Sequence, residues 1–438
     1  MTSATLFEGR HAGMGDQADG RPADRDEDVS IGGRVDTCVA VVGGGTAGIA
    51  AAAALRRSLP ASDRIVLIEP NARHYYQPGF TLVGGGVWRA GQTSCPQSEV
   101  IPPGVTWLQT RVSAYEPEHD RLQLADGRSV AYGYLVASPG LELEWDRIPG
   151  LTDALGDGRV GSIYSLSTAT DTWARIRAFR GGRALFTQPP MPIKCPGAPQ
   201  KVVYMAADYW RRQGVLGDTT LRFRTATPGL FSVTEYVPTL EAVCRRYGIE
   251  VGYGARLVSV DGPRAIATFE RQSADGATAR WEERYDLLHA VPPQGPTAAA
   301  RISTLADADG WLDVDPETLQ HRRYRNVFGM GDATSVPTSK TAAAVRAQLP
   351  VVVANLLAVM AARTPAMHYS GYASCPLITA YGKVVLAEFV YGRKVEPSLP
   401  WDSTRERRSA WWLKTKLLPW MYWQRLLRGC DLPLVARN

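Results

Sequence analysis

The sequence has few cysteines and no cysteine or histidine spacing that is typical of a metal site. Its 438 residues include six cysteines, too few and too scattered for a disulfide framework. No C-x-x-C pair and no cysteine–histidine cluster is present, so we expect no metal centre. A disulfide in such a chain would be catalytic rather than structural. The cysteines are Cys38, Cys95, Cys195, Cys244, Cys375 and Cys430.

The chain also lacks a strong excess of one charge. Its net charge of +6 suits an anionic cofactor or a membrane surface but is too diffuse to indicate nucleic-acid binding. Residues 38–55 carry no charge, yet their three consecutive glycines favour a strand and a buried helix over a membrane span. Apolar residues make up 45% and charged residues 21%, as in ordinary soluble proteins, and the length allows two or three domains.

The first 34 residues lack the features of a targeting segment. Acidic residues stand among glycines and arginines, whereas a signal peptide needs an apolar core and a transit peptide is poor in acids. This composition predicts a disordered tail.

A glycine motif follows the tail and organises the rest of the chain. Residues 39–42 are apolar and predict a strand, and residues 49–55 predict a helix. The glycines between them form G-x-G-x-x-G, which allows a tight turn, close approach of a pyrophosphate and close helix–strand packing. The helix N-terminus also favours phosphate charge. The expected phosphate-binding residues are Gly43, Gly45, Thr46, Ala47 and Gly48.

Two carboxylates suggest which dinucleotide binds. Glu69 follows the apolar residues 65–68 at the position where an acid accepts hydrogen bonds from a ribose with free hydroxyls. Asp332 follows a second strand-and-glycine turn, which includes Gly331, and could bind a ribitol hydroxyl. This second motif favours FAD over NAD. Lys340 precedes an apolar helix expected over 342–362, where a cation would stabilise a reduced flavin; a solvated lysine is the alternative.

A second β-α-β unit lacks the features that bind a nicotinamide dinucleotide. Strands are expected at 183–187 and 221–225, and helices at 200–212 and 239–247. The turn after the first strand holds prolines and Cys195 where glycines would be needed, and no acid ends the next strand. The unit is therefore predicted to have lost NAD(P)H binding. Three short runs at 255–260, 265–269 and 280–288 predict a small meander.

The C-terminal segment combines tryptophans with basic residues. Because Pro419 interrupts it, two short amphipathic helices are expected. Such a segment without a long apolar span is typical of a helix in a membrane interface, and a dimer interface or a core-packing tail is the alternative. Its aromatic and basic residues include Trp411, Trp412, Trp420, Tyr422, Trp423, Arg405, Arg407, Arg408, Lys414, Lys416, Arg425 and Arg428.

A flavin without NAD(P)H needs another electron donor, and cysteine is the natural candidate. Cys195 lies in the turn that replaces the second glycine motif, and Cys375 precedes the C-terminal segment. Both precede proline and are therefore expected to be extended. Cys95 also precedes proline, so this pattern alone does not single out the pair.

At these residues the chain resembles sulfide:quinone oxidoreductases, in particular the type found in mitochondria and many bacteria. The resemblance extends from Val39 to the end of the chain and implies two Rossmann-like dinucleotide-binding domains in a glutathione-reductase-like α/β flavoprotein. It is carried by residues 42–48, 74–86, 192–201, 311–315, 318–324, 331–334, 337–344 and 371–377. The domains implied are a tail (1–34), an FAD-binding domain (35–150 and 300–365), a second Rossmann-like domain (151–299) and a C-terminal quinone and membrane segment (366–438).

The resemblance also implies roles for single residues. Cys195 and Cys375 would form the redox pair, and hydrogen sulfide would attack it to leave a persulfide on Cys375. That sulfur would pass to sulfite, glutathione, cyanide or further sulfide, and the electrons would pass through FAD to a membrane quinone. The cofactor contacts implied further along the chain are Gln77, Pro78, Val112, Gly140, Asp332 and Lys340. Because the surroundings of Cys95 match no flavin-tethering motif, FAD is expected to bind non-covalently.

Several alternatives remain open from the sequence alone. A type II NADH:quinone dehydrogenase shares the expected fold and membrane tail, and a flavocytochrome-type sulfide dehydrogenase uses a similar cysteine pair. A flavin-binding redox sensor without turnover is a third alternative. The protein is expected to be a peripheral membrane protein on the cytoplasmic face of the cell membrane. A homodimer is one of the oligomeric states that the sequence leaves open.

Overall fold

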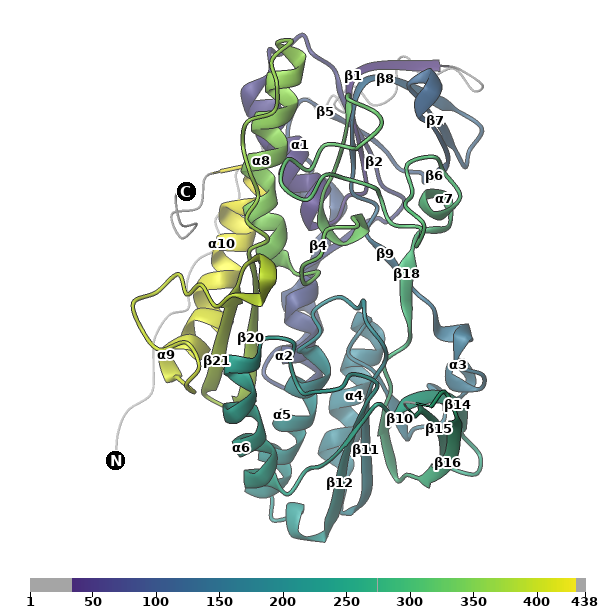
Figure 1. The fold of residues 1–438 in the computed structure, drawn as a ribbon, viewed down its shortest axis with the longest axis vertical. Coiled ribbons are helices and arrows are strands. Elements are labelled where there is room, and N and C mark those ends of the chain that lie inside the picture. The colour runs from purple at the N-terminus through teal and green to yellow at the C-terminus, as the bar shows by residue number, and fades with distance from the viewer. Residues whose placement is uncertain (1–33, 274, 431–438) are drawn as a thin grey trace, which may run out of the picture.

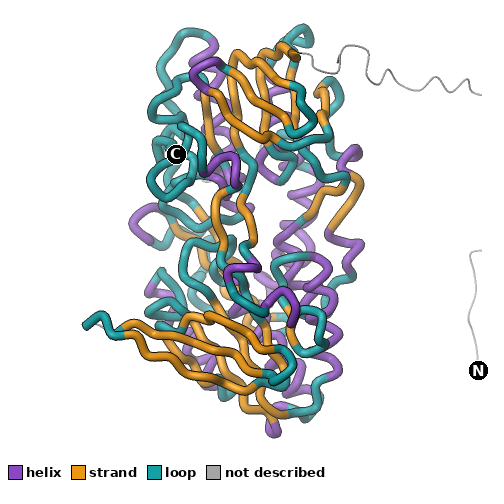
Figure 2. Tube along the Cα trace, turned by 90° about the vertical axis from the view of Figure 1, so that its right-hand side faces the viewer, coloured by secondary structure: helices purple, strands orange, loops and turns teal. Residues whose placement is uncertain are grey.

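The computed structural model describes residues 34–273 and 275–430. The molecule is elongated, with one sheet in its upper part, a second in its lower part and the C-terminal elements along one side (Figure 1). Figure 2 shows most of the strands gathered towards the two ends, with helices, loops and a few shorter strands between them. Apart from Arg34, the tail expected at residues 1–34 lies outside the described residues.

The first sheet begins at the glycine motif. Five of its strands are parallel, and two antiparallel strands extend the edge beyond β8. All four residues of β2 are buried, as expected for a parallel strand covered on both faces. The order is β5 (Val105–Leu108), β2 (Ile65–Ile68), β1 (Arg34–Val42), β8 (Ser129–Ala137), β7 (Arg121–Leu124) and β6 (Val112–Glu116), with β19 (Val327–Gly329) beside β8.

One face of this sheet is covered by two helices, α1 (Thr46–Ser58) and α8 (Ala342–Met360), which pack against each other. Helix α1 is rich in alanine and is mostly buried from Ala47 to Leu55, so it can lie close to the strands. Because β19 and α8 come late in the chain, the first unit is assembled from two separate stretches of sequence. The smaller elements nearby are β3 (Arg73–Tyr75), α2 (Phe80–Gly84), β4 (Ser94–Pro96) and α7 (Ala298–Arg301).

The second sheet has five parallel strands and confirms the expected β-α-β unit. Its strand order is β10 (Val160–Gly161), β17 (Leu287–His289), β11 (Gly182–Gln188), β12 (Thr219–Thr225) and β13 (Glu250–Tyr253). The helices are α3 (Leu151–Ala154), α4 (Leu166–Ala178), α5 (Ala198–Arg212) and α6 (Val237–Tyr247), and the meander is β14 (Arg256–Asp261), β15 (Ile266–Gln272) and β16 (Thr278–Arg284). Two short antiparallel strands, β9 (Leu141–Leu143) and β18 (Gln294–Pro296), carry the chain between the units.

The C-terminal elements form a hairpin and a helical segment. The hairpin, β20 (Ala373–Ala380) and β21 (Lys383–Phe389), packs against α5. The prediction that Pro419 separates two helices is wrong. Helix α9 (Arg408–Trp412) continues through a π-helical turn, Leu413–Leu417, into α10 (Leu418–Gln424). Pro419 lies in the first turn of α10, where its missing N–H is tolerated.

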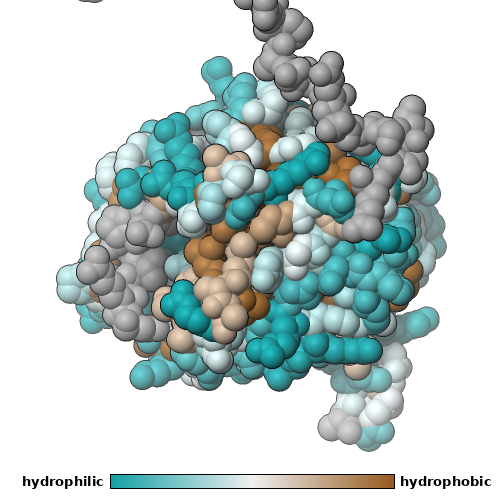
Figure 3. Space-filling view, turned by 90° about the horizontal axis from the view of Figure 1, so that it is seen from above, coloured by the Kyte–Doolittle hydropathy of each residue, from teal (hydrophilic) through white to brown (hydrophobic). Residues whose placement is uncertain are grey.

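Helix α8 is long and apolar enough to cross a membrane, with a mean hydropathy of 1.7, but half of it is buried inside the protein. It packs against α1 and β20, so it serves as a core helix of this fold. From above, an apolar stripe crosses an otherwise mainly hydrophilic face (Figure 3). Large apolar side chains are also exposed in the C-terminal helical segment, where Trp412 is 58% and Trp420 is 55% exposed.

Candidate active site

The three glycines of the first motif meet different steric demands. Gly43 has a φ of +93°, and a Cβ there would lie 2.3 Å from the carbonyl oxygen of Ser138. A Cβ on Gly48 would lie 1.7 Å from the carbonyl oxygen of Gly43, so helix and loop touch at this point. A Cβ on Gly45 would meet nothing within 4 Å. The open side of Gly45 at the start of α1 is where a pyrophosphate could approach.

Glu69 lies beside this loop rather than in a cavity. Its carboxylate accepts hydrogen bonds from the backbone N–H of Gly44, at 2.6 Å, and of Asn71, at 2.7 Å. The acid therefore ties the end of β2 to the glycine turn. Val112 begins β6 and is half-buried at the edge of the first sheet.

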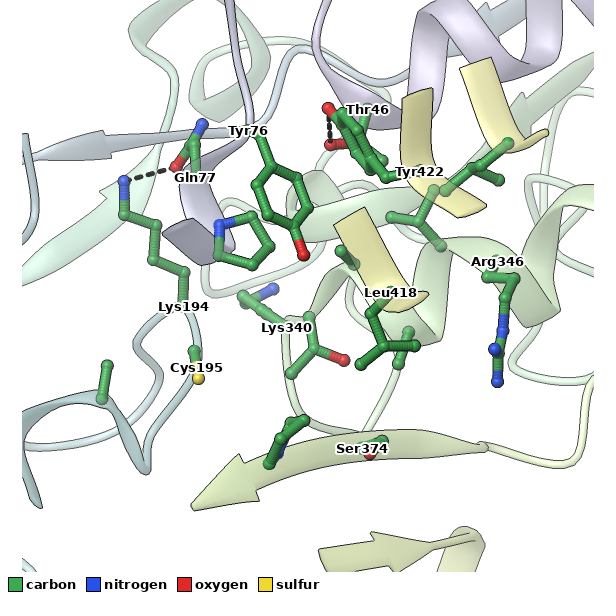
Figure 4. Close-up of a pocket in the computed structure, with 18 of the residues that line it drawn as sticks. Thr46, Tyr76, Gln77, Lys194, Cys195, Lys340, Arg346, Ser374, Leu418 and Tyr422 are labelled. Carbon is green, nitrogen blue, oxygen red and sulfur yellow. Dashed lines mark hydrogen bonds between the residues drawn. The ribbon is translucent and has the colours of Figure 1, made fainter. Parts of the chain in front are cut away.

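A cavity extends from the glycine loop to the C-terminal helices (Figure 4). It is the place where the two units and the C-terminal segment meet, since all three contribute lining residues. The sequence-predicted residues that line it are Gly45, Thr46, Ala47, Gln77, Pro78, Gly140, Cys195, Gly331, Asp332 and Lys340. Those that do not line it are Gly43, Gly48, Glu69, Val112 and Cys375.

The fold brings Cys195 and Cys375 together although they are distant in sequence. Cys195 follows β11 in the second unit, Cys375 lies in β20, and their side chains hydrogen-bond to each other. Both are free cysteines, and Cys375 is fully buried. The thiol of Cys375 donates to the sulfur of Cys195, which holds the pKa of Cys195 well below its usual range and raises that of Cys375. Cys195 is therefore the thiolate of the pair.

The expectation that both cysteines are extended holds for Cys375 but is wrong for Cys195. Cys195 has a φ of +47°. Tertiary hydrogen bonds fix this conformation: its N–H donates to the carbonyl oxygen of Lys340 at 2.8 Å, and its own carbonyl accepts from Ala198 at 2.8 Å. These bonds outweigh the preference that the following proline imposes.

Two buried lysines face the cysteine pair, and sequence reasoning missed both. The Nζ of Lys201 donates to the Sγ of Cys195 at 3.1 Å, and Lys201 is only 2% exposed. Lys414, from the C-terminal segment, donates to the carbonyl oxygen of Pro78 at 2.9 Å, and burial and the charge of Lys201 lower its pKa to about 7. Both charges favour the Cys195 thiolate. A lysine early in an otherwise apolar helix face was the available signal for Lys201.

Two further lysines lie near the expected flavin position. Lys194 points away from Cys195 and donates to the side-chain oxygen of Gln77 at 2.8 Å (Figure 4). Lys340 donates to the carbonyl oxygens of Asp332 and Thr334, and its Nζ lies 3.7 Å from the centre of the Trp311 ring. Burial lowers the pKa of each of these lysines to about 8 and raises that of Asp332.

Tyr422 joins the C-terminal helix to the glycine loop. Its hydroxyl lies 3.0 Å from the hydroxyl of Thr46 (Figure 4). The same hydroxyl lies 2.6 Å from the Nε2 of His74. The Nδ1 of His74 lies 3.0 Å from the carbonyl oxygen of Gly44. Burial lowers the pKa of His74 to about 4, so the imidazole is neutral at physiological pH. A buried polar chain thus connects the last helix to the first loop.

The fold and the site together define a flavoprotein of the two-dinucleotide-binding-domain class with a cysteine pair on the wall of its cofactor cavity. Residues 37–174 match the family model described as pyridine nucleotide-disulphide oxidoreductase.

Comparison with individual proteins narrows this class. The mitochondrial sulfide:quinone oxidoreductase of Mus musculus is 38% identical over 89% of this chain and 86% of that protein. The mitochondrial sulfide:quinone oxidoreductase of Dictyostelium discoideum is also 38% identical, over 90% of this chain and 86% of that protein. The chain therefore belongs to the sulfide:quinone oxidoreductase family.

A solved structure has the same fold. The X-ray structure of the sulfide:quinone oxidoreductase from Aquifex aeolicus superimposes with a TM-score of 0.74 at 18% identity, over 91% of this chain and 93% of that one. FAD is the cofactor of this protein, in keeping with its family. The open side of Gly45 and the half-buried acid Asp332 within one cavity fit such a group.

Proposed function

We propose that this protein oxidises hydrogen sulfide and passes the electrons through FAD to a membrane quinone. The observation that carries the proposal is the Cys195–Cys375 pair, because its thiolate member lines the cofactor cavity beside the cation of Lys201. Such a pair can accept sulfur and electrons without a nicotinamide.

The chemistry starts from the oxidised pair. Hydrosulfide attacks the sulfur of Cys375, the disulfide bond breaks, and Cys195 leaves as a thiolate that Lys201 stabilises. The persulfide on Cys375 then loses its outer sulfur to a nucleophile such as sulfite, glutathione, cyanide or sulfide. The resulting dithiol is reoxidised with the loss of two electrons. FAD, when bound, would relay these two electrons to the quinone, which takes up two protons to become a quinol.

The cofactor contacts in this proposal follow the cavity. The backbone N–H groups of residues 43–48 and the start of α1 would hold the pyrophosphate, and Asp332 the ribitol chain. Lys340 would lie near the flavin ring. Non-covalent binding is supported by Cys95, which lies outside the lining of this cavity.

Single cysteine variants test the proposal. Cys195→Ser and Cys375→Ser should each abolish sulfide oxidation while FAD stays bound, because a lone thiol cannot cycle through a disulfide. Anaerobic addition of sulfide should bleach the flavin of the unmodified protein, and quinone should restore its colour. A variant with the full rate would remove that cysteine from the mechanism.

The alternative functions predict different results in the same anaerobic measurement of the flavin spectrum. Rapid bleaching by NADH would favour a type II NADH:quinone dehydrogenase, but the prolines after β11 and Thr225–Ala226–Thr227 at the end of β12 argue against a nicotinamide site. Transfer to a cytochrome but not to quinone would favour a flavocytochrome-type dehydrogenase. Absence of turnover with every acceptor would favour a redox sensor.

The C-terminal helical segment is proposed to bind the membrane surface. Trp412 and Trp420 are exposed on it, and the side chain of Lys416 between them is exposed as well. The net charge of +6 would favour an anionic leaflet, so we assign the protein to the cytoplasmic face of the cell membrane.

Replacing both exposed tryptophans by alanine should lower binding to phospholipid vesicles without lowering the thermal midpoint. Unchanged vesicle binding would refute the anchor. If the same change converts a dimer into a monomer in sedimentation analysis, the segment is a homodimer interface instead. Protease accessibility in oriented membrane vesicles tests the assigned face.

A further inference from the structure

The cavity has an apolar arm that leads away from Cys195. The arm lies between the β20–β21 hairpin, α8 and the C-terminal helical segment. Its apolar lining residues are Pro376, Leu386, Leu399, Leu413 and Leu418. Because its walls come partly from the segment with the exposed tryptophans, a lipid-soluble molecule could enter here from a membrane.

Arg346 is a cation that lines this arm. It comes from the first turns of α8 and points down into the region between Leu418 and the strand that carries Ser374 (Figure 4). Its Nη2 donates to the hydroxyl of Tyr372 at 3.3 Å, and the guanidinium lies 5.7 Å from the centre of that ring. The Nε of Arg346 is buried and has no hydrogen-bond partner among the described residues. A buried donor without a partner is costly, which points to an acceptor that the site is built to receive.

A buried carboxylate fixes the partner of this arginine. Glu388, on β21, is 2% exposed, and its Oε1 accepts from the hydroxyls of Tyr372 at 2.5 Å and Ser398 at 2.6 Å. Tyr372 therefore donates to Glu388 and accepts from Arg346. This chain holds the guanidinium in one orientation and balances its charge, while the Nε stays available.

We propose that Arg346 binds a carbonyl oxygen of the quinone and that Tyr372 and Glu388 position it. This inference rests on the proposed function and names the residue that recognises the electron acceptor. A quinone ring suits apolar walls, and its carbonyl oxygen is the acceptor that an arginine N–H would meet. As the quinone takes up two electrons and two protons, negative charge develops on that oxygen, and a fixed guanidinium stabilises it.

Separate measurement of the two half-reactions tests the proposal. In Arg346→Met, anaerobic reduction of the flavin by sulfide should keep its rate. Reoxidation by a short-chain ubiquinone analogue should need about tenfold to hundredfold more quinone, the change expected when a hydrogen bond from a charged donor is lost. Arg346→Lys keeps the charge, so the quinone concentration needed for reoxidation should rise less than in Arg346→Met. Tyr372→Phe should raise the quinone KM with a smaller change in kcat, because it removes only the hydroxyl that orients the guanidinium.

Controls separate recognition of the quinone from general damage. Arg363→Met removes an exposed arginine just beyond α8 and should change neither half-reaction. Reoxidation by ferricyanide, which has no carbonyl group, should be unchanged in Arg346→Met when normalised to bound flavin. Equal quinone dependence in Arg346→Met and the unmodified protein would overturn the inference, as would an equal loss with ferricyanide. Failure of sulfide to reduce the flavin of the unmodified protein would instead refute the proposed function.

Discussion

Removal of the Lys201 cation should raise the pKa of Cys195. The lysine Nζ lies 3.1 Å from the Cys195 sulfur, and both the hydrogen bond and the charge favour the thiolate. A hydrogen bond to a charged group contributes about 1.5–3 kcal/mol, and one pKa unit corresponds to about 1.4 kcal/mol. Lys201→Met should therefore raise the pKa of Cys195 and lower the ratio of thiolate to thiol at a given pH about tenfold to hundredfold. The pair would still be partly ionised, because the bond from Cys375 remains.

The assay is the pH dependence of alkylation. The reduced protein is treated with iodoacetamide over a range of pH, and the peptide that contains Cys195 is quantified by mass spectrometry. A raised pKa leaves less thiolate at neutral pH, so the profile of Lys201→Met should move to higher pH. Lys201→Arg retains a cation and should shift the pH profile less. Lys394→Met, at an exposed position, should leave the profile unchanged. Coincident profiles for Lys201→Met and the unmodified protein would refute the electrostatic assignment.

Three further predictions concern the cofactor loop. Tyr422→Phe removes the hydroxyl that contacts His74 and Thr46, so FAD should be released at a lower temperature, as flavin fluorescence would report; an unchanged release temperature would contradict the link. Gly45→Val places a side chain into open space, so it should weaken FAD binding with little change in the unfolding free energy of the apoprotein. Gly48→Ala should instead destabilise the apoprotein in urea titrations, because its Cβ meets a backbone carbonyl; the reverse order of these two effects would refute the steric argument.

The elements of the fold were largely predictable because they depend on local patterns. The strand, glycine turn and helix at residues 39–55 follow each other without interruption, and the close contact that requires Gly48 is with Gly43 in the same stretch. The second β-α-β unit could be predicted from its apolar runs for the same reason. The interruption predicted at Pro419 is wrong, since a proline in the first turn of a helix looks the same in sequence as one that ends it.

The candidate site was only partly predictable. Cys195 and Cys375 were proposed as a pair through family resemblance, and spacing alone did not join them. Lys201 and Lys414 were missed because their role depends on where α5 and the C-terminal segment point their side chains. Arg346 was missed as well, because the sequence does not show that an arginine inside an apolar helix lines a cavity.

The α/β class, the dinucleotide loop and the loss of glycines in the second unit can be predicted from the chain alone, because each is a property of contiguous residues. Which cysteine is the thiolate depends on the three-dimensional arrangement. That assignment depends on a hydrogen bond across two units, on Lys201 within bonding distance and on burial, which strengthens all of these charges. The tertiary structure also sets the left-handed conformation of Cys195. The hydrogen bond from its N–H to the carbonyl oxygen of Lys340 outweighs the preference of a residue before proline for an extended conformation.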